Sequence, residues 1–373
     1  MNSTVRTDAQ LSDDVELDDQ EQLESGFAIT DMEADTTVRI AKEQYSAYEM
    51  LRREKQGRVL LAPVFQRNDV WDDKQRAEFI ESVLMGIPIP PIYLFEDETG
   101  TRQVVDGRQR ITTFKGFIGG EFKLEKLTIL AQHNGKKFSQ LAPLLQGKIE
   151  DYQLNTYVIQ PPTPESMKFN IFERVNRSST QLNKQEIRHA LYQGHATALL
   201  KKIAESEAFK LATGNSIQSQ RMRDHYIILR FIGFYIYCKG WLNDYRYDGD
   251  SDAFLATAMK DLNAMEESSI EAFYNDSVLA LTTAYGILGK NCFRFCDEDV
   301  TESGLVNAGL YEMQMFVCLE GTLKRADNSK LLTNIDYLTY NAKSSEICGK
   351  ALNTTPAFEQ RCELVMNVTK ERL

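Results

Sequence analysis

The stretch from Val104 to Phe114 constrains this chain more than any other, because it reads as a strand, a tight turn and a helix in direct succession. The β-branched pair Val104–Val105 predicts the end of a strand, and Gly107 permits a tight turn and a close approach of the backbone. A helical pattern follows from Ile111 to Phe117. A helix that starts in this way presents N–H groups and the positive end of its dipole, which favours an anion.

The residues around this turn can bind phosphate. Arg108 and Arg110 can present planar donor forks to phosphate oxygens, and the hydroxyls of Thr112 and Thr113 can each donate one hydrogen bond. Asp106 could hold a divalent ion such as Mg²⁺, or orient Arg110. The alternative is that Asp106 caps the helix and the arginines form surface salt bridges. The stretch is neither a Walker P-loop nor a dinucleotide fingerprint.

Patterns elsewhere in the chain predict further strands and helices. Strands are expected in the ranges 59–61, 92–95, 102–105 and 152–159, of which the second and third form a hairpin. Helices are expected in the range 40–56, from Asp72 or Asp73 to Leu84, from Thr163, from Asn183 with Glu186 completing a capping box, and from Arg221 to Cys238. Helical periodicity dominates the second half of the chain.

The net charge of −11 is concentrated at the N-terminus. Residues 1–36 contain eleven acidic residues and one base, Arg6, so we expect a disordered acidic tail. As an alternative, this tail could mimic nucleic acid and inhibit the protein, which deleting it would test. We expect a nucleotide-binding domain over residues 37–190 and a helical domain over residues 191–373.

Membrane and metal signals are weak. No window approaches about 18 uninterrupted apolar residues, and the N-terminus does not resemble a signal peptide, so we expect a cytoplasmic protein without a membrane partner. The cysteines lack zinc-site spacing, and we expect them to be reduced core thiols. The chain has four histidines, which are scattered along it: His133, His189, His195 and His225. No HNH-type nuclease centre is visible in this arrangement.

Several blocks of sequence, in a fixed order, resemble the N-terminal domain of GmrSD-type restriction endonucleases. The signature of that family reads Asp-Gly-Gln-Gln-Arg, a hydrophobic residue and two threonines, and residues 106–113 follow it except at Arg108, where the family has glutamine. Further matching blocks are Gln66–Arg67 with Val70–Trp71, Ile80–Pro91, Phe172–Asn176 and Gln185–Arg188. A weaker match continues at residues 221–231, so the resemblance covers about residues 58–265.

The resemblance implies an α+β fold, in which a ParB/sulfiredoxin-like domain with a small mixed sheet precedes a mainly α-helical domain. It also implies a nucleoside triphosphate as ligand or substrate. Carried onto this sequence, Asp106 and Arg110 are the expected catalytic residues. The phosphate-binding residues are then Gly107, Arg108, Gln109, Arg110, Thr112 and Thr113, with Gln66 and Arg67 reaching the same cleft. Asn176, Arg177, Glu186 and Arg188 are expected to support the site.

Three functions remain open at this point. The first is a nucleotide-binding, NTP-hydrolysing module that acts on or senses DNA in a restriction or phage-defence system. A separate nuclease subunit is a further candidate partner, which the helical half would dock if the protein is regulatory. The second is a non-catalytic regulatory protein that binds DNA or a protein partner through the same loop. The third is a ParB-like DNase. Arg108 bears on the choice, because an extra cation strengthens phosphate binding but displaces a group that could position water.

Overall fold

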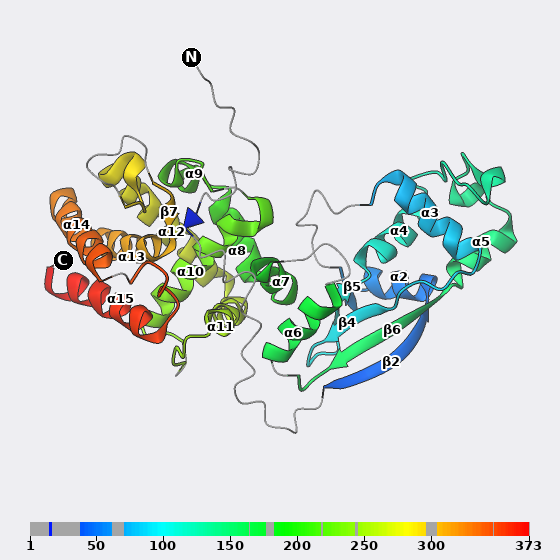
Figure 1. The fold of residues 1–373 in the computed structure, drawn as a ribbon, viewed down its shortest axis with the longest axis horizontal. Helices are drawn as coiled ribbons and strands as arrows, with labels where there is room; N and C mark the ends of the chain where they lie inside the picture. The colour runs from blue at the N-terminus through cyan, green and yellow to red at the C-terminus, as the bar shows by residue number, and fades with distance from the viewer. Residues whose placement is uncertain are drawn as a thin grey trace, which may run out of the picture. The chain divides into compact units, whose positions relative to one another are not determined.

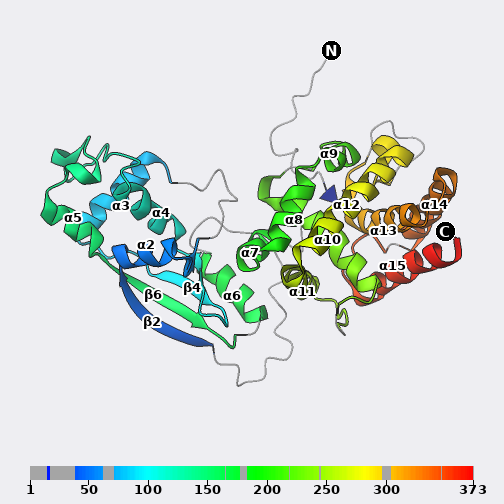
Figure 2. The same cartoon turned by 180° about the vertical axis from the view of Figure 1, so that it is seen from behind.

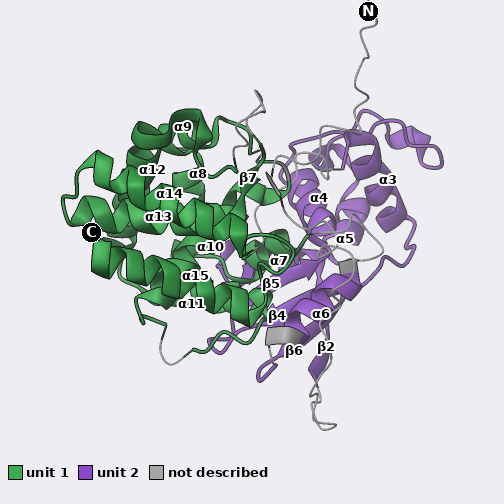
Figure 3. Cartoon of the chain, turned by 60° about the vertical axis from the view of Figure 1, so that its left-hand side comes forward, with its two compact units in different colours: residues 1–25, 183–373 green, residues 26–182 purple. Residues whose placement is uncertain are grey.

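The structure is a computed structural model, and it describes residues 15–16, 38–61, 71–163, 165–176, 183–217, 219–242, 245–295, 304–345 and 347–372. The chain divides into two compact units, one of residues 26–182 and one of residues 183–373 together with 1–25 (Figure 3). The division falls after Leu182, so the helix that starts at Lys184 belongs to the helical unit. The expected acidic tail lies outside the described residues except at positions 15 and 16.

The first unit contains a five-stranded mixed sheet in the order β2-β6-β4-β5-β3 (Figure 1). The strands are β2 (Arg39–Ser46), β3 (Val59–Leu60), β4 (Ile92–Glu96), β5 (Arg102–Asp106) and β6 (Gln153–Gln160). β2 pairs with β6 and β4 with β5 in antiparallel fashion, whereas β4 runs parallel to β6 and β3 parallel to β5. The expected small mixed sheet and its hairpin are confirmed.

The helix predicted over residues 40–56 is wrong in its first part. Residues Arg39–Ser46 form a strand in which every residue pairs with β6, and only α2 (Ala47–Lys55) is helical. The Ser46 side chain accepts a hydrogen bond from the amide of Glu49 and so caps the helix. The long-range pairing with β6 therefore prevails over a local pattern that mixes apolar and charged residues.

The other helices of the first unit are α3 (Asp73–Leu84), α4 (Arg108–Ile118), α5 (Pro143–Glu150) and α6 (Glu165–Asn176). Helices α2, α3 and α4 lie on one side of the sheet and enclose its core (Figure 1). Asp72 caps α3 with a capping box, so the predicted start of this helix is confirmed. Phe114 and Phe117 of α4 are fully buried in the core, which fixes α4 against the sheet.

The second unit is built almost entirely of helices, as expected. These are α7 (Lys184–Leu191), α8 (His195–Ala204), α9 (Glu207–Thr213), α10 (Arg223–Cys238), α11 (Ser251–Ala264), α12 (Glu267–Leu288), α13 (Ala308–Leu323), α14 (Asn328–Ser344) and α15 (Thr355–Asn367). α13 contacts α10, α12, α14 and α15 (Figure 2), and its residues Ala308 to Gly321 are all buried. The short strands β1 (Val15–Glu16) and β7 (Val306–Asn307) pair in parallel.

A buried charge cluster joins three of these helices. Glu312 of α13 accepts hydrogen bonds from Arg230 Nε at 2.6 Å and from Arg361 Nε at 3.1 Å. The three side chains are at most 4 % exposed, so the two guanidinium groups share one carboxylate.

Among the described residues, no helix has the length and apolar character needed to cross a bilayer.

Candidate functional site

The strand, turn and helix predicted around Gly107 are present. β5 ends at Asp106 and α4 begins at Arg108, and Gly107 between them adopts a φ of 100°. A β-carbon at Gly107 would lie 2.8 Å from Cγ1 of Ile92, a residue that is fully buried. Both the backbone conformation and the close approach to Ile92 therefore require glycine at this position.

The side chain of Arg110 stabilises this turn from within. Its Nη2 donates to Oδ2 of Asp106 at 2.5 Å, and its Nη1 donates to the carbonyl oxygens of Pro90 and, at 2.9 Å, Pro91. The Arg110 side chain is only 10 % exposed. The geometry thus makes Arg110 a link between the end of β5 and the segment that precedes β4.

The two threonine hydroxyls bond to their own helix. Thr112 Oγ1 donates to the carbonyl oxygen of Arg108 at 3.0 Å, and Thr113 Oγ1 donates to that of Gln109 at 2.7 Å. Thr113 is also buried, with 2 % of its surface exposed. In this conformation both hydroxyls stabilise the first turns of α4 instead of facing a ligand.

Arg108 and Gln109 occupy the first turn of α4. Arg108 is half-buried, and this burial lowers the pKa of its guanidinium group. Gln109 Oε1 accepts a hydrogen bond from the amide of Trp71 at 3.5 Å. Within the described part of the chain, no side chain caps α4 and its first turn contains no acidic residue. No acidic side chain in the first turn of α4 therefore offsets the positive end of the helix dipole.

The other predicted residues are not all described. Gln66, Arg67 and Arg177 lie outside the described residues, as does the side chain of Asn176 at the end of α6. Glu186 and Arg188 belong to the helical unit, and both are buried. Glu186 completes the predicted capping box of α7 with Asn183, while Arg188 pairs with Asp252 of α11.

One row of side chains that the sequence did not reveal ends at the turn. The strand registers place Asp106 opposite Tyr93, Tyr93 opposite Tyr157, and Tyr157 opposite Lys42, so the row crosses β5, β4, β6 and β2. The rings of Tyr93 and Tyr157 stack with centroids 5.3 Å apart, and Lys42 Nζ lies 5.7 Å from the centroid of the Tyr157 ring. Register is a tertiary property, which is why the pattern of each strand alone could not predict the row.

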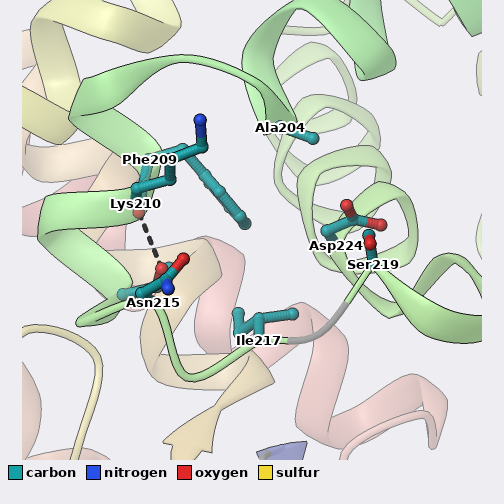
Figure 4. A pocket seen from close by; sticks show the side chains of 8 residues that line it. Ala204, Phe209, Lys210, Asn215, Ile217, Ser219 and Asp224 are labelled. Carbon is teal, nitrogen blue, oxygen red and sulfur yellow. Dashed lines mark hydrogen bonds between the residues drawn. The ribbon is translucent and has the colours of Figure 1, made fainter.

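The helical unit has a separate pocket of about 380 Å³ between α9 and the start of α10 (Figure 4). Phe209, Lys210, Asn215 and Asp224 contribute to its lining. Asp224 is 7 % exposed, and its Oδ1 accepts a hydrogen bond from the amide of His225 at 2.8 Å. Burial raises the pKa of this carboxyl group.

Two of the scattered histidines meet in this unit. The rings of His189 and His225 lie 5.4 Å apart, and burial lowers the pKa of both, that of His189 to about 3. Among the described residues, no three His, Cys, Asp or Glu side chains gather in a way that could hold a metal. The five described cysteines are free, and the thiols of Cys238 and Cys362 lie 2.7 Å apart.

Comparison with known proteins concerns the part of the chain that carries the turn. Residues 47–193 match the model of a family described as GmrSD restriction endonuclease, N-terminal domain. No curated protein and no solved structure matches the chain. The matched range includes residues 106–113 and α7, whereas the weaker blocks expected at residues 221–231 lie beyond it. Residues 47–193 of this chain are therefore similar to the N-terminal domain of GmrSD restriction endonucleases.

Proposed function

We propose that the loop from Asp106 to Thr113 binds the phosphates of a nucleoside triphosphate, and that the chain is a cytoplasmic, nucleotide-dependent module of a restriction or phage-defence system that acts on DNA. The observation that carries this proposal is the Gly107 turn, which starts α4 without a side-chain cap and places Arg108 in its first turn. Uncapped helix N-termini with an adjacent arginine suit phosphate oxygens. The similarity of residues 47–193 to the GmrSD N-terminal domain supports the restriction context.

The residues of the loop take different roles in this proposal. Arg108 and the first amide groups of α4 bind the phosphates, and Gln109 orients the attacking water where hydrolysis occurs. Arg110 is a positioning residue, because Asp106, Pro90 and Pro91 already accept its hydrogen bonds. Thr112 and Thr113 stabilise α4 through their bonds to its carbonyl oxygens.

A magnesium ion fits the loop only as part of a metal–nucleotide complex. Asp106 is the one carboxylate of the turn, and its Oδ2 already accepts a hydrogen bond from Arg110. Mg²⁺ is commonly bound by one or two carboxylates together with substrate phosphates, and it neutralises charge on those phosphates. Asp106 would therefore supply at most one ligand, with the phosphates supplying others.

A non-catalytic switch is the second candidate function. The engaged state of Arg110 and of both threonine hydroxyls favours it, because these groups would not have to act in a hydrolytic step. In this case nucleotide or DNA phosphate bound at the loop would control a partner such as a separate nuclease subunit. Nucleotide turnover distinguishes the two candidates.

The test measures phosphate release from ATP, GTP and CTP with Mg²⁺, with and without DNA. Arg108→Ala should weaken nucleotide binding and lower turnover, whereas Arg108→Gln, which restores the family's residue, should retain or raise turnover. Lys115→Ala is the matched control, because Lys115 lies at the other end of α4 and forms an exposed pair with Glu54. Binding without turnover in the wild type would identify the switch. Absence of nucleotide binding would refute the proposal.

DNA binding is tested separately through its dependence on salt. If several phosphates of DNA are neutralised, the affinity should fall steeply between low and physiological salt, whereas a single nucleotide should respond less. An affinity for DNA that does not change with salt would exclude DNA as the phosphate-bearing partner.

A further inference from the structure

The row of side chains that ends at Asp106 borders a shallow cavity on the sheet. The cavity has a volume of about 530 Å³, and Lys42, Gln44, Pro91, Asn155 and Tyr157 contribute to its lining. Tyr157 is half-buried, so part of its ring is accessible. Two neighbouring strands, β2 and β6, thus combine an aromatic ring, a cation and two amides at one cavity.

The polar groups of this cavity suit the edge of a planar heterocycle. Gln44 Nε2 donates to Asn155 Oδ1 at 2.9 Å, which leaves Gln44 Oε1 as an acceptor and Asn155 Nδ2 as a donor. Such a pair can recognise a ring that carries both a donor and an acceptor on one edge. The tyrosine ring can stack on the face of the same heterocycle, as aromatic side chains do with nucleobases.

The charges around the cavity also suit a phosphate-bearing ligand. Glu43 contributes to the lining, but its carboxylate accepts hydrogen bonds from both terminal nitrogens of Arg102, at 2.6 and 3.0 Å. This bonding to Arg102 lowers the pKa of Glu43, and the same guanidinium group also pairs with Glu96, so one positive charge is shared by two carboxylates. Lys42 is exposed and can contact a ligand or the π-face of Tyr157.

Pro91 links the lining of the cavity to the loop from Asp106 to Thr113. Pro91 belongs to this lining, and the carbonyl oxygen of Pro91 accepts a hydrogen bond from Arg110 of the loop. Tyr93, which stacks on Tyr157, is paired with Asp106 across the β4–β5 ladder. Neighbouring strands lie about 4.8 Å apart, so Tyr157 is about 10 Å from Asp106 across the sheet.

We propose that Tyr157, Lys42 and the Gln44–Asn155 amide pair form the base-binding subsite for the nucleotide whose phosphates bind at Arg108. This inference rests on the proposed function and adds where the base is held. Tyr157 stacks on the base, the amide pair contacts its edge, and Lys42 lies beside the stack. Tyr93 supports the Tyr157 ring from the β4 side.

The experiment measures the affinity of the full chain for ATP, GTP, CTP and inorganic triphosphate by calorimetry. Tyr157→Val should weaken nucleotide binding about 5- to 150-fold, the loss expected for one stacked base. The affinity for inorganic triphosphate, which has no base, should not change. Tyr157→Phe retains the ring and should bind nucleotides nearly as the wild type does.

Two further variants test whether a loss of affinity comes from misfolding rather than from the loss of a ligand contact. Lys42→Gln alters an exposed side chain and should weaken nucleotide binding about 2- to 5-fold without affecting triphosphate. Tyr48→Val removes a tyrosine of α2 that is 58 % exposed and should leave every affinity unchanged. Arg108→Ala, by contrast, should weaken the binding of nucleotides and triphosphate alike.

Four results would overturn the inference. Unchanged nucleotide affinity in Tyr157→Val and Lys42→Gln, while Arg108→Ala still loses it, would refute the base subsite and keep the proposed function. If Tyr157→Val weakens the binding of nucleotide and of inorganic triphosphate equally, the ring has a structural role only. An effect limited to single-stranded oligonucleotides would assign the surface to nucleic acid. A wild type that binds neither nucleotide nor triphosphate would remove both proposals.

Discussion

Replacing Gly107 by alanine should destabilise the first unit by more than the cost of the left-handed backbone conformation alone. A φ of 100° lies well beyond the left-handed helical region near 57°. A left-handed conformation costs an alanine about 1–2 kcal/mol. Contact of the new β-carbon with Ile92 Cγ1 at 2.8 Å adds an overpacking cost of about 1–3 kcal/mol. We therefore expect Gly107→Ala to lower the free energy of unfolding by about 2–5 kcal/mol.

Gly120→Ala provides the matched control. Gly120 follows α4 with a φ of 76°, and nothing lies within 4 Å of a β-carbon built there. Its replacement should cost only the conformational part, about 1–2 kcal/mol. The difference between the two variants then isolates the contact with Ile92.

The assay is urea unfolding of the full chain, followed by tryptophan fluorescence. The chain has two tryptophans, and replacing Trp241 with phenylalanine leaves Trp71 as the reporter of the first unit. Trp71 lies beside Phe79 of α3, and its amide contacts Gln109 of the loop. The Gly107, Gly120 and Ile92 variants are compared in this Trp241→Phe background.

A double-mutant cycle with Ile92→Ala completes the test. Ile92→Ala removes Cγ1 at 2.8 Å and Cγ2 at 3.3 Å but keeps Cβ at 3.3 Å, so Gly107→Ala should then cost less than it does beside the intact Ile92 and approach the cost of Gly120→Ala. The reasoning is refuted if Gly107→Ala and Gly120→Ala destabilise equally, or if the cost of Gly107→Ala is the same with and without the Ile92 branches.

Three further predictions concern charged groups in both units. Asp106→Asn should lower the free energy of unfolding of the first unit by about 1–3 kcal/mol in the same assay, because Arg110 loses a charged acceptor. Glu54→Gln, which removes the partner of Lys115, is the control, and a smaller change in Asp106→Asn than in Glu54→Gln would contradict the prediction. Glu312→Gln should destabilise the helical unit by about 3–5 kcal/mol, read from Trp241, since it leaves two buried guanidinium groups without their shared carboxylate. Burial lowers the pKa of His189 from 6.5 to about 3 on folding, so protonation of this ring favours the unfolded chain. The free energy of unfolding should therefore be highest above pH 6.5 and should decrease as the pH falls toward 3. His189→Gln should flatten the dependence of stability on pH in that window, and an unchanged slope would argue against the burial of this ring.

The sequence by itself predicted the local elements that carry the candidate loop. The hairpin, the Asp72 and Asn183 caps and the turn at Gly107 follow from residue types that satisfy backbone groups within a few positions, so neighbours in sequence are enough to specify them. The family resemblance is confirmed over residues 47–193 for the same reason, because the blocks that carry it are local.

Where long-range partners compete with local preference, the sequence was insufficient. Residues 40–46 read as helix but form β2, because pairing with β6 satisfies their backbone in the sheet. His189 and His225 are distant in sequence and meet through the packing of α7 and α10. The ion-pair partners of Arg188 and Glu312 likewise come from other helices.

The loop itself shows the same division. Composition and spacing determined that a strand, a glycine turn and a helix with two arginines follow one another, because each choice is dictated by backbone conformation. Only the tertiary structure decided that Arg110 bonds inward to Asp106 and the prolines, and that Tyr93, Tyr157 and Lys42 extend a row from Asp106. Hydrogen-bond partners and strand register depend on which segments meet in space, and that is a property of the whole fold.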